Sequence, residues 1–67
     1  MNHLTAPELS AIRNQLQTET SLAERYLRCA KRCTDPQLKT RCESIAARHR
    51  EHCQTLLTLL GEGAMRQ

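Results

Sequence analysis

Mostly apolar residues recur at heptad spacing in two long segments of this 67-residue chain. In the second segment seven positions alternate in steps of four and three: Leu38, Cys42, Ile45, His49, His52, Leu56 and Leu59. In the first segment eight positions keep the same spacing: Leu9, Ile12, Leu16, Glu19, Ala23, Tyr26, Ala30 and Cys33. This pattern is typical of helices that pack along their whole length, so the sequence predicts an all-α fold.

Capping signals place the beginning of each helix. Thr5 is followed three residues later by Glu8, with a proline between them, which is the pattern of a capping box. The first helix is therefore expected over about residues 6–33. Pro36 disfavours a helical residue before it, and Asp35 can cap the helix that follows.

The second helix is expected over about residues 37–60, after a turn at 34–36. Gly61 and Gly63 predict its end and leave a frayed tail over 61–67. Because the turn is so short, the second helix must run back against the first. The sequence thus predicts an antiparallel helical hairpin that forms one small domain.

A hairpin of this size is expected to need a partner. Below roughly 70–80 residues a single core rarely supplies more than about 3–5 kcal/mol, and Tyr26 is the only aromatic residue. Two heptad stripes cannot both be buried within one hairpin, so an apolar band stays open along one side. We expect a homodimer in which two hairpins form a four-helix bundle. The alternatives are a partly molten lone hairpin and one that docks on an unrelated protein.

A polar layer interrupts the predicted seam. If Cys33 lies opposite Leu38, facing residues have numbers that sum to 71, which places Glu19 opposite His52. His49 lies one turn earlier on the same face. Burying these groups unpaired would cost several kcal/mol, whereas zinc, iron or manganese would take them as ligands. The sequence predicts a metal site there; the alternative is a Glu19–His52 hydrogen bond that fixes the helix register.

The cysteines form a second candidate cluster. Cys29 and Cys33 lie one turn apart, and Cys42 falls opposite Cys29 in the same register. Three thiols near the turn could bind zinc or Cu(I), and nearby arginines and lysines are expected to lower their pKa values. Cys53, one turn after His49, has a peripheral heptad position and could touch the histidine layer. The alternatives are small core-filling residues and a Cys29–Cys42 disulfide in an oxidising setting.

Charge and composition argue against several other classes of function. The net charge is +3, and eight of the ten basic residues lie between Arg25 and Arg50. They form a solvated helix face or a surface for anions or RNA, and the scarcity of aromatic residues for base stacking argues against nucleic acid. No signal-peptide pattern or long apolar stretch is present, which predicts a cytoplasmic, non-membrane protein with reduced cysteines. Without a Gly-rich loop or a nucleophile–base pair, the sequence also argues against an enzyme.

The order of these residues resembles half of a ferritin-like bundle, in which each hairpin supplies a Glu and a Glu-x-x-His motif. Glu19 matches the first Glu, and Tyr26, seven residues later, matches a Tyr that hydrogen-bonds to a ligand. His52 matches the His of the motif, whereas His49 stands where the second, metal-bridging Glu would be. The resemblance implies a ferritin-like four-helix bundle, but this departure argues against di-iron oxygen chemistry.

The segment TDPQLKTRCESIAARHREHCQTLL is also similar to short coat-F-like proteins of spore-forming Firmicutes, over most of residues 8–60. That resemblance implies a small ferritin-like helical protein with spore association or other protein partners. Three functions therefore follow from the sequence. They are a Glu/His metal-binding protein, a non-catalytic structural protein of the spore-coat type, and a cysteine-based Cu(I) or zinc buffer.

Overall fold

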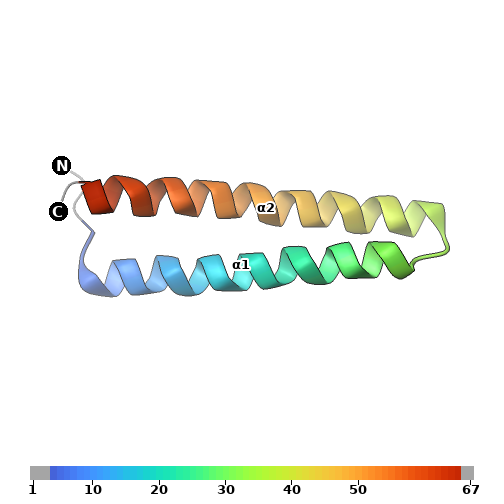
Figure 1. Cartoon of the computed structure of the whole chain (residues 1–67), viewed down its shortest axis with the longest axis horizontal. Coiled ribbons are helices and arrows are strands. Elements are labelled where there is room, and N and C mark those ends of the chain that lie inside the picture. The colour runs from blue at the N-terminus through green and yellow to red at the C-terminus, as the bar shows by residue number, and fades with distance from the viewer. Residues whose placement is uncertain (1–3, 66–67) are drawn as a thin grey trace.

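Two long antiparallel helices form the structure (Figure 1). The computed structural model describes residues 4–65, in which α1 spans Ala6–Arg32 and α2 spans Pro36–Met65. The start of α1 and the end of α2 lie at the same end of the molecule (Figure 1). The predicted all-α hairpin is confirmed, and residues 4–65 contain no strand. No helix in that range combines the length and apolarity that crossing a bilayer requires.

Side chains cap the start of α1, and a backbone hydrogen bond marks its end. The Thr5 hydroxyl accepts a hydrogen bond from the Glu8 amide at 3.2 Å, and a Glu8 carboxylate oxygen accepts one from the Thr5 amide at 2.8 Å. This reciprocal pair is the predicted capping box. At the other end, the Cys33 amide donates to the Cys29 carbonyl at 3.0 Å before the backbone becomes extended.

The turn is short because Asp35 caps α2 directly. Its carboxylate oxygen Oδ1 accepts a hydrogen bond from the Gln37 amide at 2.9 Å, and its carbonyl accepts from the Lys39 amide at 3.0 Å. Pro36 is the first residue of α2, where its missing N–H costs nothing. Three residues thus separate the helices, which requires α2 to return along α1.

The predicted end of α2 at Leu60 is wrong, because the helix continues to Met65. Neither Gly61 nor Gly63 takes the left-handed conformation that ends a helix at glycine. A Cβ atom at Gly61 would meet nothing within 4 Å, so no neighbouring segment forces the chain to turn there. Glycine costs a helix about 1 kcal/mol relative to alanine, and this penalty alone does not terminate α2.

The face that α2 turns toward α1 also differs from the prediction. On α1 all eight predicted seam positions are buried or half-buried. On α2, Leu38, His52 and Leu59 are exposed, and Ala46, which the predicted stripe omits, is 0% exposed. The buried or half-buried positions of α2 are Cys42, Ile45, Ala46, Ala47, His49, Cys53, Leu56 and Leu60. The inner face of a nearly straight helix gradually rotates away from positions that repeat every seven residues. The small side chain of Ala46 is favoured on this face because it allows the two helix backbones to approach closely.

The resulting core is small. Among residues 4–62, whose burial the structure describes, the buried apolar residues are Ala23, Ala30, Cys42 and Ala46. The leucines and isoleucines along the seam are at best half-buried. Glu19 is the buried charged residue of this region, at 6% exposure. A single hairpin therefore buries small residues and one carboxylate, and leaves its large apolar side chains partly in water.

Candidate functional site

Glu19 lies between two histidines of the facing helix. The carboxylate projects from the middle of α1, and His49 and His52 project from α2 one turn apart. The Nδ1 atom of His52 lies 2.7 Å from Glu19 Oε1, and the Nδ1 atom of His49 lies 3.0 Å from Oε2 and 3.3 Å from Oε1. The structure thus brings together the three side chains that the sequence predicts at one level.

The rings of Tyr26, His49 and His52 pack against one another near the Glu19 carboxylate. The imidazoles of His49 and His52 meet edge to face, with centroids 5.9 Å apart and an interplanar angle of 85°. The ring of Tyr26 stacks on His49 at 5.9 Å with an angle of 18°. Tyr26 was expected to donate a hydrogen bond to a ligand, but its contact in the structure is this stack. The tyrosine ring therefore orients the His49 imidazole through its face.

Hydrogen bonding stabilises the charged form of the buried carboxylate. The hydrogen bond from His52, followed by the one from His49, lowers the pKa of Glu19 below its ordinary value of 4.5, although burial opposes the shift. When Nδ1 carries a proton in both rings, each histidine donates to a separate carboxylate oxygen. Among residues 4–62, no buried side-chain nitrogen or oxygen lacks a hydrogen-bond partner. The cluster is thus a satisfied polar network inside an apolar seam.

The lowered pKa of Glu19 predicts acid lability of the metal-free hairpin. Because the folded state holds the carboxylate ionised more strongly than the unfolded chain does, its contribution is present above about pH 4.5. That contribution is lost as the pH falls through the folded pKa. We expect the free energy of unfolding, measured by urea titration with a chelator present, to decrease below pH 4.5. Glu19→Gln should flatten this decrease, whereas Glu24→Gln, at an exposed position, should keep the native profile.

Solvent reaches the cluster from one side. His52 has 59% of its side chain exposed, whereas His49 has 19% and Glu19 has 8%. A hollow of about 310 Å³ opens beside the carboxylate and is lined by Gln15, Glu19, His52, Thr55 and Leu56. An ion or water molecule can therefore approach Glu19 along the flank of α2 that carries His52.

Three cysteines converge at the turn end of the hairpin, as the register predicts. The Cys42 thiol donates to the Cys29 sulfur at 3.6 Å, and the sulfurs of Cys29 and Cys33 lie 4.0 Å apart. Cys29 is exposed, Cys33 is half-buried and Cys42 is buried, and all three are free thiols. Their sulfur atoms lie within 4.8 Å of one another, close enough to bind one ion.

The prediction that basic neighbours lower the thiol pKa values is wrong for two of these cysteines. The hydrogen bond with Cys29, followed by burial, raises the pKa of Cys42 to about 11. Burial, followed by the hydrogen bond with Cys29, raises the pKa of Cys33 above its ordinary value of 9.0. Neighbouring thiols and desolvation outweigh the arginines, which project into solvent. Without a metal, both groups are therefore protonated thiols near neutral pH.

Cys53 does not join either cluster. It lies on the inner face of α2 and is half-buried, in contrast to its predicted peripheral position. Its sulfur is 3.5 Å from the Thr20 hydroxyl of α1. The shifted α2 face explains this contact, which the predicted heptad pattern misses. The structure thus supports a set of three thiols at the turn and a fourth that packs between the helices.

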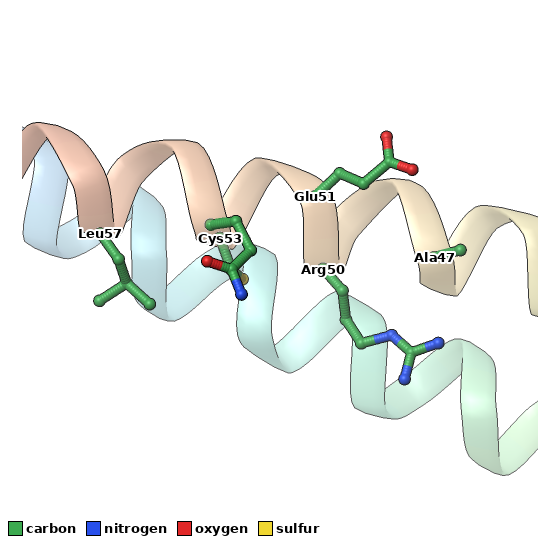
Figure 2. A pocket seen from close by; sticks show the side chains of 6 residues that line it. Ala47, Arg50, Glu51, Cys53 and Leu57 are labelled. Atoms are coloured by element: carbon green, nitrogen blue, oxygen red, sulfur yellow. The ribbon is translucent and has the colours of Figure 1, made fainter.

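A shallow hollow on the opposite flank of α2 lacks comparable chemistry. Its lining comes from α2 alone: Ala47, Arg50, Glu51, Cys53, Gln54 and Leu57. Figure 2 shows the side chains of Arg50 and Glu51 diverging from each other rather than converging on a common point. Leu57, at one end, is 51% exposed. The candidate ligands are therefore concentrated at the Glu19 level and at the turn.

The fold and these clusters define a two-helix hairpin protein with metal-competent side chains grouped at its middle and at its turn. No family model, curated protein or solved structure matches the sequence. The function is therefore inferred from the chain's own side chains.

Proposed function

We propose that this chain is a small metal-binding protein in which Glu19, His49 and His52 bind a transition-metal ion such as zinc, iron or manganese. The observation that carries the proposal is the convergence of one carboxylate and two imidazoles, from two different helices, within 4.8 Å. Neutral imidazole nitrogen and carboxylate oxygen are suitable ligands for each of these ions.

The distances within the cluster are compatible with a bound ion. Two ligand atoms held at about 2.0–2.2 Å from one ion lie about 3–3.5 Å apart. The separations from His49 Nδ1 to Glu19 are 3.0 and 3.3 Å, and that from His52 Nδ1 to Glu19 is 2.7 Å. An ion would replace the Nδ1 protons that now join these atoms, so small side-chain adjustments suffice. A neutral imidazole that binds through Nδ1 keeps its ring proton on Nε2, whereas a protonated histidine must lose a proton first, so the affinity falls at low pH.

Three protein ligands leave room for a fourth, and a second copy of the hairpin is a natural source of it. The molecule measures 48 × 16 × 11 Å, which is a single layer of two helices. The chain exposes 5260 Å², compared with about 4,300 Å² expected for a globular protein of 7.7 kDa. The excess is similar to the roughly 800 Å² that each partner buries in a standard interface.

The surface that would form this interface lies on the same flank as the metal cluster. Leu38, Ile45, His52 and Leu59 are spaced seven residues apart along α2. Leu38 is 50% exposed and Leu59 is 41% exposed, with His52 between them. A second hairpin that covers this flank would bury the leucines and bring two Glu/His layers together. The four-helix bundle implied by the ferritin-like resemblance is part of this proposal.

A structural function is the second candidate, and one observation favours it. The Glu19 cluster is fully hydrogen-bonded without an ion, so it is able to act as a polar layer that fixes helix register. In this alternative the chain is an interaction module of the spore-coat type, and a metal is not required.

Metal analysis of the purified chain, prepared without an affinity tag, separates the two functions. We expect zinc, iron or manganese to bind in a fixed ratio to the native protein. The double variant His49→Gln/His52→Gln should lose this metal while its circular dichroism remains helical. His3→Gln provides a matched imidazole control and should bind as the native chain does. A helical native protein that binds none of these ions would favour the structural function.

A further inference from the structure

We propose that Cys29, Cys33 and Cys42 form a second and separate metal site, which binds one Cu(I) ion next to the turn of the hairpin. The three sulfur atoms come from both helices and lie within 4.8 Å of one another. Cys29 is the central member, with Cys42 at 3.6 Å and Cys33 at 4.0 Å. The three-residue turn and the Asp35 cap hold α2 against α1 at this level.

The number and type of ligands favour Cu(I). Cu(I) is a soft ion that selects thiolate ligands, whereas structural zinc sites are almost always four-coordinate. Cys53, the remaining cysteine, lies eleven residues beyond Cys42 on the same helix, or about 16 Å away at 1.5 Å per residue. Asp35 already accepts the Gln37 amide as the cap of α2. The cluster therefore offers three soft ligands without an evident fourth.

The side chains around the cysteine cluster carry a net positive charge, which complements the negative charge of a Cu(I)–thiolate complex. One Cu(I) with three thiolates carries two negative charges in excess. A hollow beside the turn is lined by Cys29 and Cys33 and by four charged residues, in which Arg25, Arg28 and Arg32 outnumber Asp35. Three guanidinium groups can offset the excess charge after the ion has bound. The same hollow gives access to Cys29, the most exposed of the three thiols.

Contacts between the sulfur atoms explain how the three ligands converge before metal arrives. Three thiolates at these separations would repel one another, whereas neutral thiols donate hydrogen bonds between their sulfurs. Cu(I) must then displace the thiol protons, as metal binding to cysteine requires.

This site is independent of the Glu19 cluster. Glu19 and Cys29 lie ten residues apart on α1, which corresponds to about 15 Å. The two sites share no side chain. Carboxylate and imidazole suit harder or borderline ions, whereas thiolate suits Cu(I). Each site can therefore be removed without changing the ligands of the other.

Competition with a coloured chelator tests the proposal. Cu(I) is supplied anaerobically as its bicinchoninate complex to the reduced full-length chain, with a phosphine as the reductant. The native chain should withdraw one Cu(I) per molecule. Cys29→Ser and Cys33→Ser, at exposed and half-buried positions, should each weaken Cu(I) binding by about 100-fold or more. Even residues that only hydrogen-bond to a metal ligand contribute about 10- to 100-fold to metal affinity.

Two matched variants serve as controls. Cys53→Ser removes the cysteine outside the cluster, and His49→Gln/His52→Gln removes the imidazoles. Both should retain native Cu(I) affinity, so a failure of the Glu/His proposal would leave this result unchanged. The inference is overturned if Cys29→Ser and Cys33→Ser bind Cu(I) as tightly as the native chain does. It is also overturned if Cys53→Ser lowers the Cu(I) affinity as much as those two variants do. Exclusive uptake of zinc by the same thiols would also overturn it. Circular dichroism of each variant confirms that its helices remain folded.

Discussion

Leu38→Glu/Leu59→Glu is expected to be monomeric and largely unfolded at concentrations at which the proposed dimer of the native chain forms. Each leucine leaves 41–50% of its side chain in water in the isolated hairpin. Since complete burial of a leucine contributes about 1.5–3 kcal/mol, covering the exposed halves of four leucines in a dimer contributes about 3–6 kcal/mol. Replacing them by like charges removes this gain and adds repulsion. Analytical ultracentrifugation combined with circular dichroism measures both consequences.

The opposite flank of α2 provides the control. Leu57 is equally exposed, at 51%, but lies on the side away from His52. Leu57→Glu should therefore leave the dimer and its helicity close to native. The proposed dimer face would be refuted by a double variant that sediments as the native chain does. It would equally be refuted by a native chain that is a stable, fully helical monomer.

The second large effect is stabilisation by metal. A ligand that binds only the folded state at 100 times its dissociation constant contributes about 2.7 kcal/mol. For a domain of this length, each kcal/mol shifts the thermal midpoint by about 4–8 °C. Saturating zinc or manganese is thus expected to raise the midpoint by about 10–20 °C at fixed protein concentration. Thermal unfolding followed by circular dichroism, with and without the ion, measures the shift.

Glu19→Leu tests whether the carboxylate is needed for this stabilisation. Removing one member of a buried charged network leaves its partners unpaired and is usually destabilising, and here the Nδ1 groups of His49 and His52 lose their acceptor. The variant should therefore unfold at a lower temperature than the metal-free native protein, and should gain little stability when metal is added. An unchanged metal-induced shift in this variant would remove Glu19 from the ligand set. An unchanged thermal midpoint without metal would show that the hydrogen bonds it accepts from His52 and His49 only offset the cost of burying it.

Local signals made much of the fold predictable. Thr5 and Glu8 fix the start of α1, and Asp35 fixes the start of α2, through side-chain to backbone hydrogen bonds between near neighbours. Because the turn is short, a simple register then brings together residues that are far apart in sequence. The facing pair Cys29 and Cys42 is an example. Such predictions depend on interactions whose geometry the chain dictates locally.

The site was predictable in its members but less so in its details. The convergence of Glu19 with both histidines follows from the register. The rotation of α2 could not be predicted from the register. It depends on how closely the helices approach at small residues such as Ala46, and a hydropathy pattern gives such residues little weight. That rotation exposes His52 and brings Cys53 inward.

The chemistry of individual groups was the hardest part to predict. The thiol pKa values rise because the cysteines hydrogen-bond to one another and are desolvated, and both causes require three-dimensional distances. The continuation of α2 past Gly61 depends on the absence of any neighbour that would favour a turn at that glycine.

The exposed ring of His52 on the flank of Leu38 and Leu59 links two equilibria. If the same surface both receives an ion and pairs with another copy, each event must strengthen the other by an equal factor. Scarce metal would then favour separate, loosely held hairpins, and abundant metal would favour closed pairs. Subunit association would in this way report the availability of the ion, without any moving domain or additional segment of chain.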